Sequence, residues 1–157
     1  MIIVNGDLLE SPLRIIAHQV NCKGVMGGGI ARQLRWKYTG LFEEYQKHIK
    51  DCDNPLGSYY LFRAKNENKE ILNIFGQDGF GTDKQYTDYQ AVYIAFENYI
   101  LDTKKLFENK TYPQMVIGIP YGFGCGLGGG NWNIMRSILE RIEKEEDVVF
   151  IAYKLGD

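Results

Sequence analysis

A glycine-rich run over residues 118–132 constrains this chain more than any other feature. It contains seven of the 18 glycines, and six of them fall within residues 122–130. The apolar stretch 115–119 before the run predicts a strand, and the pattern over 133–144 after it predicts a helix. A strand, a glycine loop and a helix start allow backbone N–H groups to converge on an anion. The alternative is a mobile surface loop, but residues 122–130 contain no Ser or Pro, which favours a loop that binds a phosphate-containing ligand.

A second glycine loop follows another strand. Residues 14–20 are almost continuously apolar, which is typical of a buried strand, and they lead into a loop that contains Gly27, Gly28 and Gly29. A helix is expected to begin near Gly29. Both glycine loops therefore leave the carboxyl end of a strand, and in an open α/β sheet such loops meet at one rim, where ligands bind.

The rest of the chain alternates between strand and helix patterns. Residues 2–4 and 148–153 predict strands, and 58–63 and 70–75 predict the two strands of a hairpin. Thr87 to Gln90 matches a capping box that would open a long helix through Phe107. On the last helix, the spacing of Ile134, Ile138 and Ile142 predicts a buried stripe. This order predicts an α/β fold with three layers (α/β/α) and a mixed, largely parallel sheet.

Composition narrows the class of protein. A length of 157 residues suits one domain over residues 1–157, and the net charge of −2 argues against a general nucleic-acid-binding surface. Cys22, Cys52 and Cys125 show no metal-ligand spacing, so we expect neither a metal nor another cofactor. Free thiols favour a reducing, cytoplasmic location. The first residues read as a strand rather than a signal peptide, and we expect a monomer without a membrane segment.

The common nucleotide motifs do not account for the two loops. No Gly-Lys-Ser/Thr follows the glycines, as a Walker loop requires. Residues 122–128 satisfy loose forms of Gly-x-Gly-x-x-Gly, but they follow the penultimate strand, which is the wrong place for a Rossmann fingerprint. Kinase-like and dehydrogenase functions are therefore disfavoured.

Five segments in order along the chain resemble the macrodomain family, whose members bind ADP-ribose. They are Val4-Asn-Gly-Asp-Leu8, Ala17-His-Gln-Val-Asn21, Gly27-Gly-Gly-Ile-Ala31, Ile119-Pro-Tyr-Gly-Phe-Gly-Cys-Gly126, and Tyr153 in the last strand. The segment Gly-Cys-Gly-Leu followed by Trp132 is similar to the terminal ADP-ribose protein glycohydrolase branch. The first loop is similar to the yeast-type ADP-ribose-1″-phosphate phosphatase branch.

The resemblance implies a role for each segment. Asp7 would accept a hydrogen bond from the adenine amino group, and Tyr153 would pack against adenine. The alternatives are that Asp7 is only a turn residue and that Tyr153 is only a core aromatic at the end of a strand. Asn21 would reach the distal ribose, and the glycine loops would wrap the diphosphate. The residues expected to bind the ligand are Asp7, Leu8, Asn21, Gly27, Gly28, Gly29, Ile30, Ala31, Pro120, Tyr121, Gly122, Phe123, Gly124, Cys125, Gly126 and Tyr153.

The catalytic residues of the glycohydrolase branch are not carried over. Gln77 stands at the position of the branch's catalytic lysine and Gly128 at that of its aspartate, so a lysine-adduct mechanism is disfavoured. Lys84, in the adjacent loop, is a candidate to replace that lysine, and a solvent-exposed surface lysine is the alternative. A phosphatase-like or ester-hydrolysing mechanism, in which bound water attacks the group on the distal ribose, is expected instead, with Asn21 positioning the water and His18 as a candidate acid or base. A buried core histidine is the alternative for His18.

Further candidates lie on the loops. Anion-binding N–H groups would lower the pKa of the Cys125 thiol, although a merely small residue also fits there. Asp78, Asp83 and Tyr86 lie on a loop that could close over the distal ribose, and solvated loop residues are the alternative.

Three functions remain open on these observations. The leading prediction is an enzyme that hydrolyses a 1″-linked group from an ADP-ribose derivative: ADP-ribose-1″-phosphate, O-acyl-ADP-ribose, or ADP-ribosylated protein or nucleic acid. A reader that binds ADP-ribose without turnover is the alternative. An interaction module without a nucleotide is disfavoured because both glycine loops are intact.

Overall fold

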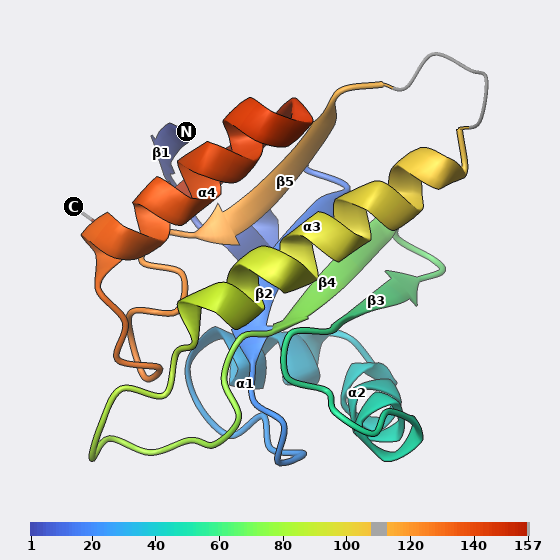
Figure 1. Ribbon diagram of the computed structural model, residues 1–157. Helices are drawn as coiled ribbons and strands as arrows, with labels where there is room; N and C mark the ends of the chain where they lie inside the picture. Colours follow the sequence, from blue (N-terminus) through green and yellow to red (C-terminus); the bar gives the residue numbers. More distant parts are fainter. Residues whose placement is uncertain (108–112, 157) are drawn as a thin grey trace.

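The computed structural model describes residues 1–107 and 113–156, and it shows a six-stranded sheet between two helical layers (Figure 1). The strands are β1 (Ile2–Asn5), β2 (Ile15–Val20), β3 (Tyr59–Ala64), β4 (Lys69–Phe75), β5 (Met115–Pro120) and β6 (Val148–Lys154). The helices are α1 (Gly29–Lys37), α2 (Leu41–Asp51), α3 (Tyr89–Lys105) and α4 (Trp132–Glu146), with a short 3₁₀ turn, η1, at Leu8–Glu10.

The sheet is mixed and largely parallel, as the sequence predicts. The strand order is β1-β6-β5-β2-β4-β3. The β3–β4 hairpin is the antiparallel pair, and the other neighbours run parallel. The carboxyl ends of the parallel strands therefore share one edge, and the loops that follow β2, β4 and β5 gather there (Figure 1).

Helices cover both faces of this sheet, which confirms the three-layer prediction. Phe96 of α3 and Leu139 of α4 belong to the core on one face, where they pack with Phe150 of β6. Leu34 of α1 and Tyr45 of α2 belong to the core on the other face. Each fully buried apolar side chain of this size stabilises the fold by about 1.5–3 kcal/mol. None of the helices in the described ranges is long and apolar enough to cross a membrane.

The predicted stripe on the last helix is confirmed at Ile142, which is buried, and at Ile138, which packs half-buried against the core, but it is wrong at Ile134. Ile134 is 47% exposed, whereas Met135, Leu139 and Ile142 are buried. A row spaced strictly by four residues winds around a helix with 3.6 residues per turn, so Ile134 and Ile142 cannot both face the core squarely. Alternating spacings of four and three, as in 135, 139 and 142, keep a stripe on one face.

The capping box on the third helix is also wrong. Asp88, not Thr87, caps α3, because its carboxylate accepts a hydrogen bond from the Ala91 N–H at 3.0 Å. The helix ends at Lys105 instead of Phe107. Thr87 is free of the helix, and its hydroxyl is used elsewhere, in the site described next.

Candidate functional site

Three adjoining cavities form a continuous trough along the carboxyl edge of the sheet. The first, of about 370 Å³, lies at the ends of β1 and β6. The central cavity, of about 270 Å³, lies between the two glycine loops and shares Ile30, Pro120 and Tyr121 with the first. The far cavity, of about 390 Å³, shares Gly28, Ala31 and several other residues with the central one. The two glycine loops thus meet at one rim, as predicted.

The first cavity brings together three residues that the sequence nominates. Asp7, Leu8 and Tyr153 all line it. One carboxylate oxygen of Asp7 accepts a hydrogen bond from the Leu9 N–H at 3.0 Å, which starts the short turn η1. Asp7 is therefore a cap, and its second oxygen remains available to a donor in the cavity. Tyr153 is half-buried beside Gly6.

The central cavity is walled by backbone rather than by charged side chains. Helix α1 begins there, and its N-cap, Gly28, makes no side-chain capping bond. The first-turn N–H groups and the positive end of the helix dipole consequently favour an anion. Across the cavity, Gly122 and Gly124 have φ angles of +76° and +73°, in the left-handed region that favours glycine. These positions line the cavity together with Pro120, Tyr121, Phe123 and Gly126.

Cys125 departs from the sequence expectation. It does not line any of the three cavities, and its thiol lies 3.3 Å from the Phe123 carbonyl oxygen. Burial raises the pKa of the thiol to about 11, whereas the expectation was a lowered pKa. A thiol that stays protonated at neutral pH is a poor nucleophile, so the structure does not support a nucleophilic role.

A directed hydrogen-bond network supports the glycine loop that follows β5. Gln19 Nε2 donates to Gln77 Oε1 at 2.7 Å and to Thr87 Oγ1 at 2.8 Å. Thr87 Oγ1 then donates to the Gly124 carbonyl at 2.6 Å, and Gln77 Nε2 donates to the Gly79 carbonyl at 2.8 Å. Because each carbonyl can only accept, the direction of every bond in the network is fixed.

The sequence analysis missed Gln19 and Thr87. A strand alternates its side chains between two faces, so Gln19 shares a face with Ala17, which packs in the α3–α4 core. A polar residue on the same strand face as Ala17, two positions before Asn21, is the signal that would have identified it. The sequence pattern around Thr87 matches a helix capping box, so nothing in it indicates a contact with the glycine loop.

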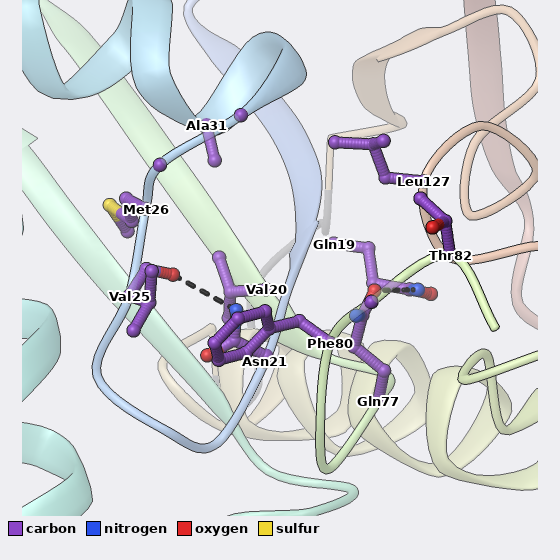
Figure 2. A pocket seen from close by; sticks show the side chains of 13 residues that line it. Gln19, Val20, Asn21, Val25, Met26, Ala31, Gln77, Phe80, Thr82 and Leu127 are labelled. Atoms are coloured by element: carbon purple, nitrogen blue, oxygen red, sulfur yellow. Dashed lines mark hydrogen bonds between the residues drawn. The ribbon is translucent and has the colours of Figure 1, made fainter.

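The far cavity is lined by amides, glycines and apolar side chains (Figure 2). Asn21 lines it, as predicted. Its Oδ1 accepts from the Lys23 N–H at 3.0 Å and from the Tyr45 hydroxyl at 2.8 Å, and its Nδ2 donates to the Val25 carbonyl at 2.9 Å. Oδ1 therefore accepts hydrogen bonds from within the protein, while one N–H of Nδ2 remains for a ligand oxygen.

The loop after β4 contributes different residues from those expected. Phe80, Gly81 and Thr82 line the far cavity. Asp78, Asp83, Lys84 and Tyr86 do not line the trough: Asp78 pairs with Lys23 at 3.2 Å, Asp83 accepts from the Tyr86 hydroxyl at 2.6 Å, and the Lys84 ammonium lies over the Tyr86 ring. Phe80 is 53% exposed and, together with Leu127, gives the cavity an apolar rim.

His18 is the core histidine rather than an acid or base of the trough. It is fully buried, and its Nε2 lies 2.6 Å from Asn73 Oδ1. The Asn73 amide donates to the Tyr60 carbonyl, so its oxygen must accept, and Nε2 carries the proton. Nδ1 has no partner among the described residues. Burial lowers the pKa of His18 to about 4, and His18 lines none of the three cavities.

The two positions aligned with glycohydrolase catalytic residues carry none of that chemistry here. Gln77 lines the central and far cavities but is an uncharged amide held by two hydrogen bonds. At Gly128, a Cβ would lie 2.4 Å from Thr87 Oγ1 and 2.9 Å from the Gly124 carbonyl oxygen. This loop conformation therefore excludes every side chain at residue 128, an aspartate included.

Solved structures of other proteins share the fold of this chain. Among solved structures, the macrodomain of Mycobacterium tuberculosis DarG superposes with a TM-score of 0.74 at 24% identity, covering 97% of each chain. This chain has the macrodomain fold. A structure of Thermosipho africanus DarTG in complex with ADP-ribose has a TM-score of 0.78 at 20% identity; the match covers 97% of this chain and 40% of that one.

Sequence comparison finds both groups that the motifs of this chain resemble. An ADP-ribose 1″-phosphate phosphatase of Scheffersomyces stipitis is 26% identical over 170 residues, which cover 94% of this chain and 98% of that protein. A DNA ADP-ribosyl glycohydrolase of Mycobacterium tuberculosis is 37% identical over 153 residues, or 95% of this chain, but the chain spans only 40% of that protein. No protein-family model matches the chain.

Proposed function

We propose that this protein binds ADP-ribose along the trough and hydrolyses a group linked to the 1″ position of the distal ribose. The observation that carries the proposal is the continuity of the three cavities through both glycine loops. Adenine would occupy the first cavity, the diphosphate the central one and the distal ribose the far one. Relatives named as hydrolases of ADP-ribose derivatives support turnover over binding alone.

Each end of the ligand has a matching group in the protein. The free oxygen of Asp7 would accept a hydrogen bond from the adenine amino group, and Tyr153 would pack against the ring. The diphosphate would be held by backbone N–H donors and the α1 dipole, because the side chains that line the central cavity are uncharged. The remaining N–H of Asn21 would donate to a ribose hydroxyl or to the attacking water.

The lining of the far cavity also limits the reaction. It contains Gln19, Asn21 and Gln77 but no titratable side chain. When water attacks C1″, the bond from C1″ to the departing group breaks and the water's proton passes to solvent. Because no acid is present to protonate the departing group, the site favours groups that leave as stable anions, such as phosphate or a carboxylate. We therefore rank ADP-ribose-1″-phosphate and acyl-ADP-ribose ahead of substrates linked through a nucleobase.

One assay separates turnover from binding alone. The protein is incubated with ADP-ribose-1″-phosphate, O-acetyl-ADP-ribose, and ADP-ribosylated protein and DNA, and release of ADP-ribose is followed while its affinity is measured by calorimetry. We expect binding of ADP-ribose and turnover of one of the first two substrates. Binding without any turnover would leave a reader, and absence of binding would remove the proposal altogether.

A loop variant ties the result to the trough. In Gly124→Val, Cβ alone would lie 2.9 Å from Gln19 Oε1 and 3.0 Å from Met135 Cε, at a φ that disfavours branched residues. We expect loss of ADP-ribose binding. Cys125→Ser, next to it but outside the cavities, is the matched control and should keep both affinity and turnover.

A further inference from the structure

The net charge of −2 conceals an uneven distribution of charge. All of the acidic residues lie outside residues 11–42, a segment that carries five basic ones: Arg14, Lys23, Arg32, Arg35 and Lys37. Three of these are used within the protein, because Arg14 pairs with Glu70, Lys23 with Asp78 and Lys37 with Glu10. Arg32 and Arg35 form no ion pair with any residue that the structure describes.

Both unpaired arginines lie on α1 and stack on aromatic rings. The guanidinium carbon of Arg32 lies 4.4 Å from the centre of the Trp36 ring, and that of Arg35 lies 3.5 Å from the centre of the Phe42 ring. Stacking orders a guanidinium while leaving the N–H donors on its edge available for a planar anion. Trp36 is 70% exposed, so much of its ring is open to a further flat group.

This face of α1 adjoins the trough. The first residues of the same helix, Gly29 to Ala31, line the central cavity, and Gln33 lines the first cavity. With a rise of about 1.5 Å per residue, Trp36 lies only about 10 Å along the helix axis from the cavity wall. A polymer seated on the face would thus pass beside a ligand in the trough without entering it.

We propose that Arg32, Arg35 and Trp36 form a docking surface for single-stranded nucleic acid, with phosphates on the two arginines and a base stacked on the indole. An acidic peptide would match the charge of the two arginines, but its carboxylates would not stack on the exposed indole ring beside them. A base has an aromatic face to stack, and sequence-tolerant binding of single strands combines cations with such aromatic platforms. Two arginines are too few for a duplex site, so the surface fits a short single strand.

The test measures binding of a fluorescein-labelled oligodeoxythymidylate by anisotropy, at low and at high salt. We expect weak binding that weakens further with salt. R32E/R35E should lose about tenfold or more in affinity, and W36A about fivefold or more, as expected for one base stacked on an aromatic ring. The control R136E/R141E makes the same change of charge on α4, across the sheet, and should bind as the wild type does.

Two further arms make the outcome decisive. Saturating ADP-ribose should not displace the oligonucleotide, and R32E/R35E should bind ADP-ribose normally, so this surface and the proposed function stand or fall separately. Absence of oligonucleotide binding, or equal losses in the two double variants, would overturn the proposal. A labelled polyglutamate peptide that binds as tightly, with W36A unaffected, would overturn it in favour of an acidic protein partner. Circular dichroism checks that each variant is folded.

Discussion

The Thr87 hydroxyl donates a hydrogen bond to the Gly124 carbonyl at 2.6 Å, and this contact joins the loop before α3 to the glycine loop after β5. The same hydroxyl accepts from Gln19 Nε2 at 2.8 Å. Thr87 is only 4% exposed, so water cannot replace either partner if the hydroxyl is lost. The residues that shape the wall of the trough therefore come from three separate segments that the fold brings together.

Replacing Thr87 tests this support directly. Thr87→Val keeps the shape of the side chain but removes the donor to Gly124 and the acceptor for Gln19, so we expect a loss of about 1–3 kcal/mol in the free energy of unfolding. Thr87→Ser keeps the hydroxyl and should retain most of the stability and the affinity for ADP-ribose. Urea denaturation and calorimetry measure both. Equal behaviour of the two variants would mean that the hydroxyl is not what holds the loop.

The glycine loop itself offers a matched pair of substitutions. In Gly128→Ala, the added Cβ would overlap Thr87 Oγ1 at 2.4 Å and force the loop to move. We expect a loss of about 1–3 kcal/mol in the free energy of unfolding, as for other overpacked sites. In Gly126→Ala, the Cβ meets nothing within 4 Å, and the change in stability should stay within about 0.5 kcal/mol. A stable Gly128→Ala protein would show that residue 128 tolerates a side chain after all.

The sheet and both glycine loops were predictable because their signals are local. Apolar runs define β2 and β5, and glycines directly after a strand favour a loop whose backbone approaches a ligand closely. The order of the elements then restricts the topology, since parallel strands joined by helices leave their loops at one edge. The prediction for Ile134 in the α4 stripe failed for a local reason as well, because Ile134 and Met135 are both apolar and only the packed helix selects between them.

The interior of the site was not predictable in the same way. His18 and Gln19 are neighbours in β2 and therefore point to opposite faces, but the sequence does not say which face meets the glycine loop. The structure places His18 against Asn73 and Gln19 against Thr87. That choice depends on pairing between residues 55 and 68 positions apart in the chain, which no local pattern encodes.

The role of Asp7 can be tested with the ligand rather than the protein alone. Inosine diphosphate ribose lacks the amino group from which Asp7 is proposed to accept a hydrogen bond. The wild type should therefore bind it about tenfold or more weakly than ADP-ribose, as a lost hydrogen bond to a charged group implies. Asp7→Asn keeps an oxygen for the Leu9 N–H but places an amide where the second carboxylate oxygen was, and should discriminate less between the ligands. Calorimetry of both ligands with both proteins measures the effect. If Asp7→Asn discriminates between the two ligands as strongly as the wild type does, Asp7 only caps η1 and does not contact the adenine amino group.

The lowered pKa of His18 makes the free energy of unfolding depend on pH. In the folded protein its pKa is lowered to about 4 by burial, whereas in the unfolded chain it returns to about 6.5. Between these values the unfolded state binds the additional proton, so the free energy of unfolding falls as pH falls from 6.5 towards 4. The contribution is on the order of 3 kcal/mol, and it is fully recovered above pH 6.5.

A variant without this titration isolates the effect. His18→Gln can donate to Asn73 but does not titrate, so the difference in free energy of unfolding between variant and wild type should change across this range and level off above it. The carboxylates and His48 titrate in both proteins and cancel in the difference. Urea denaturation at a series of pH values gives the two curves. Parallel curves would mean that His18 protonates in the folded state as readily as in the unfolded chain, and that burial does not keep it neutral.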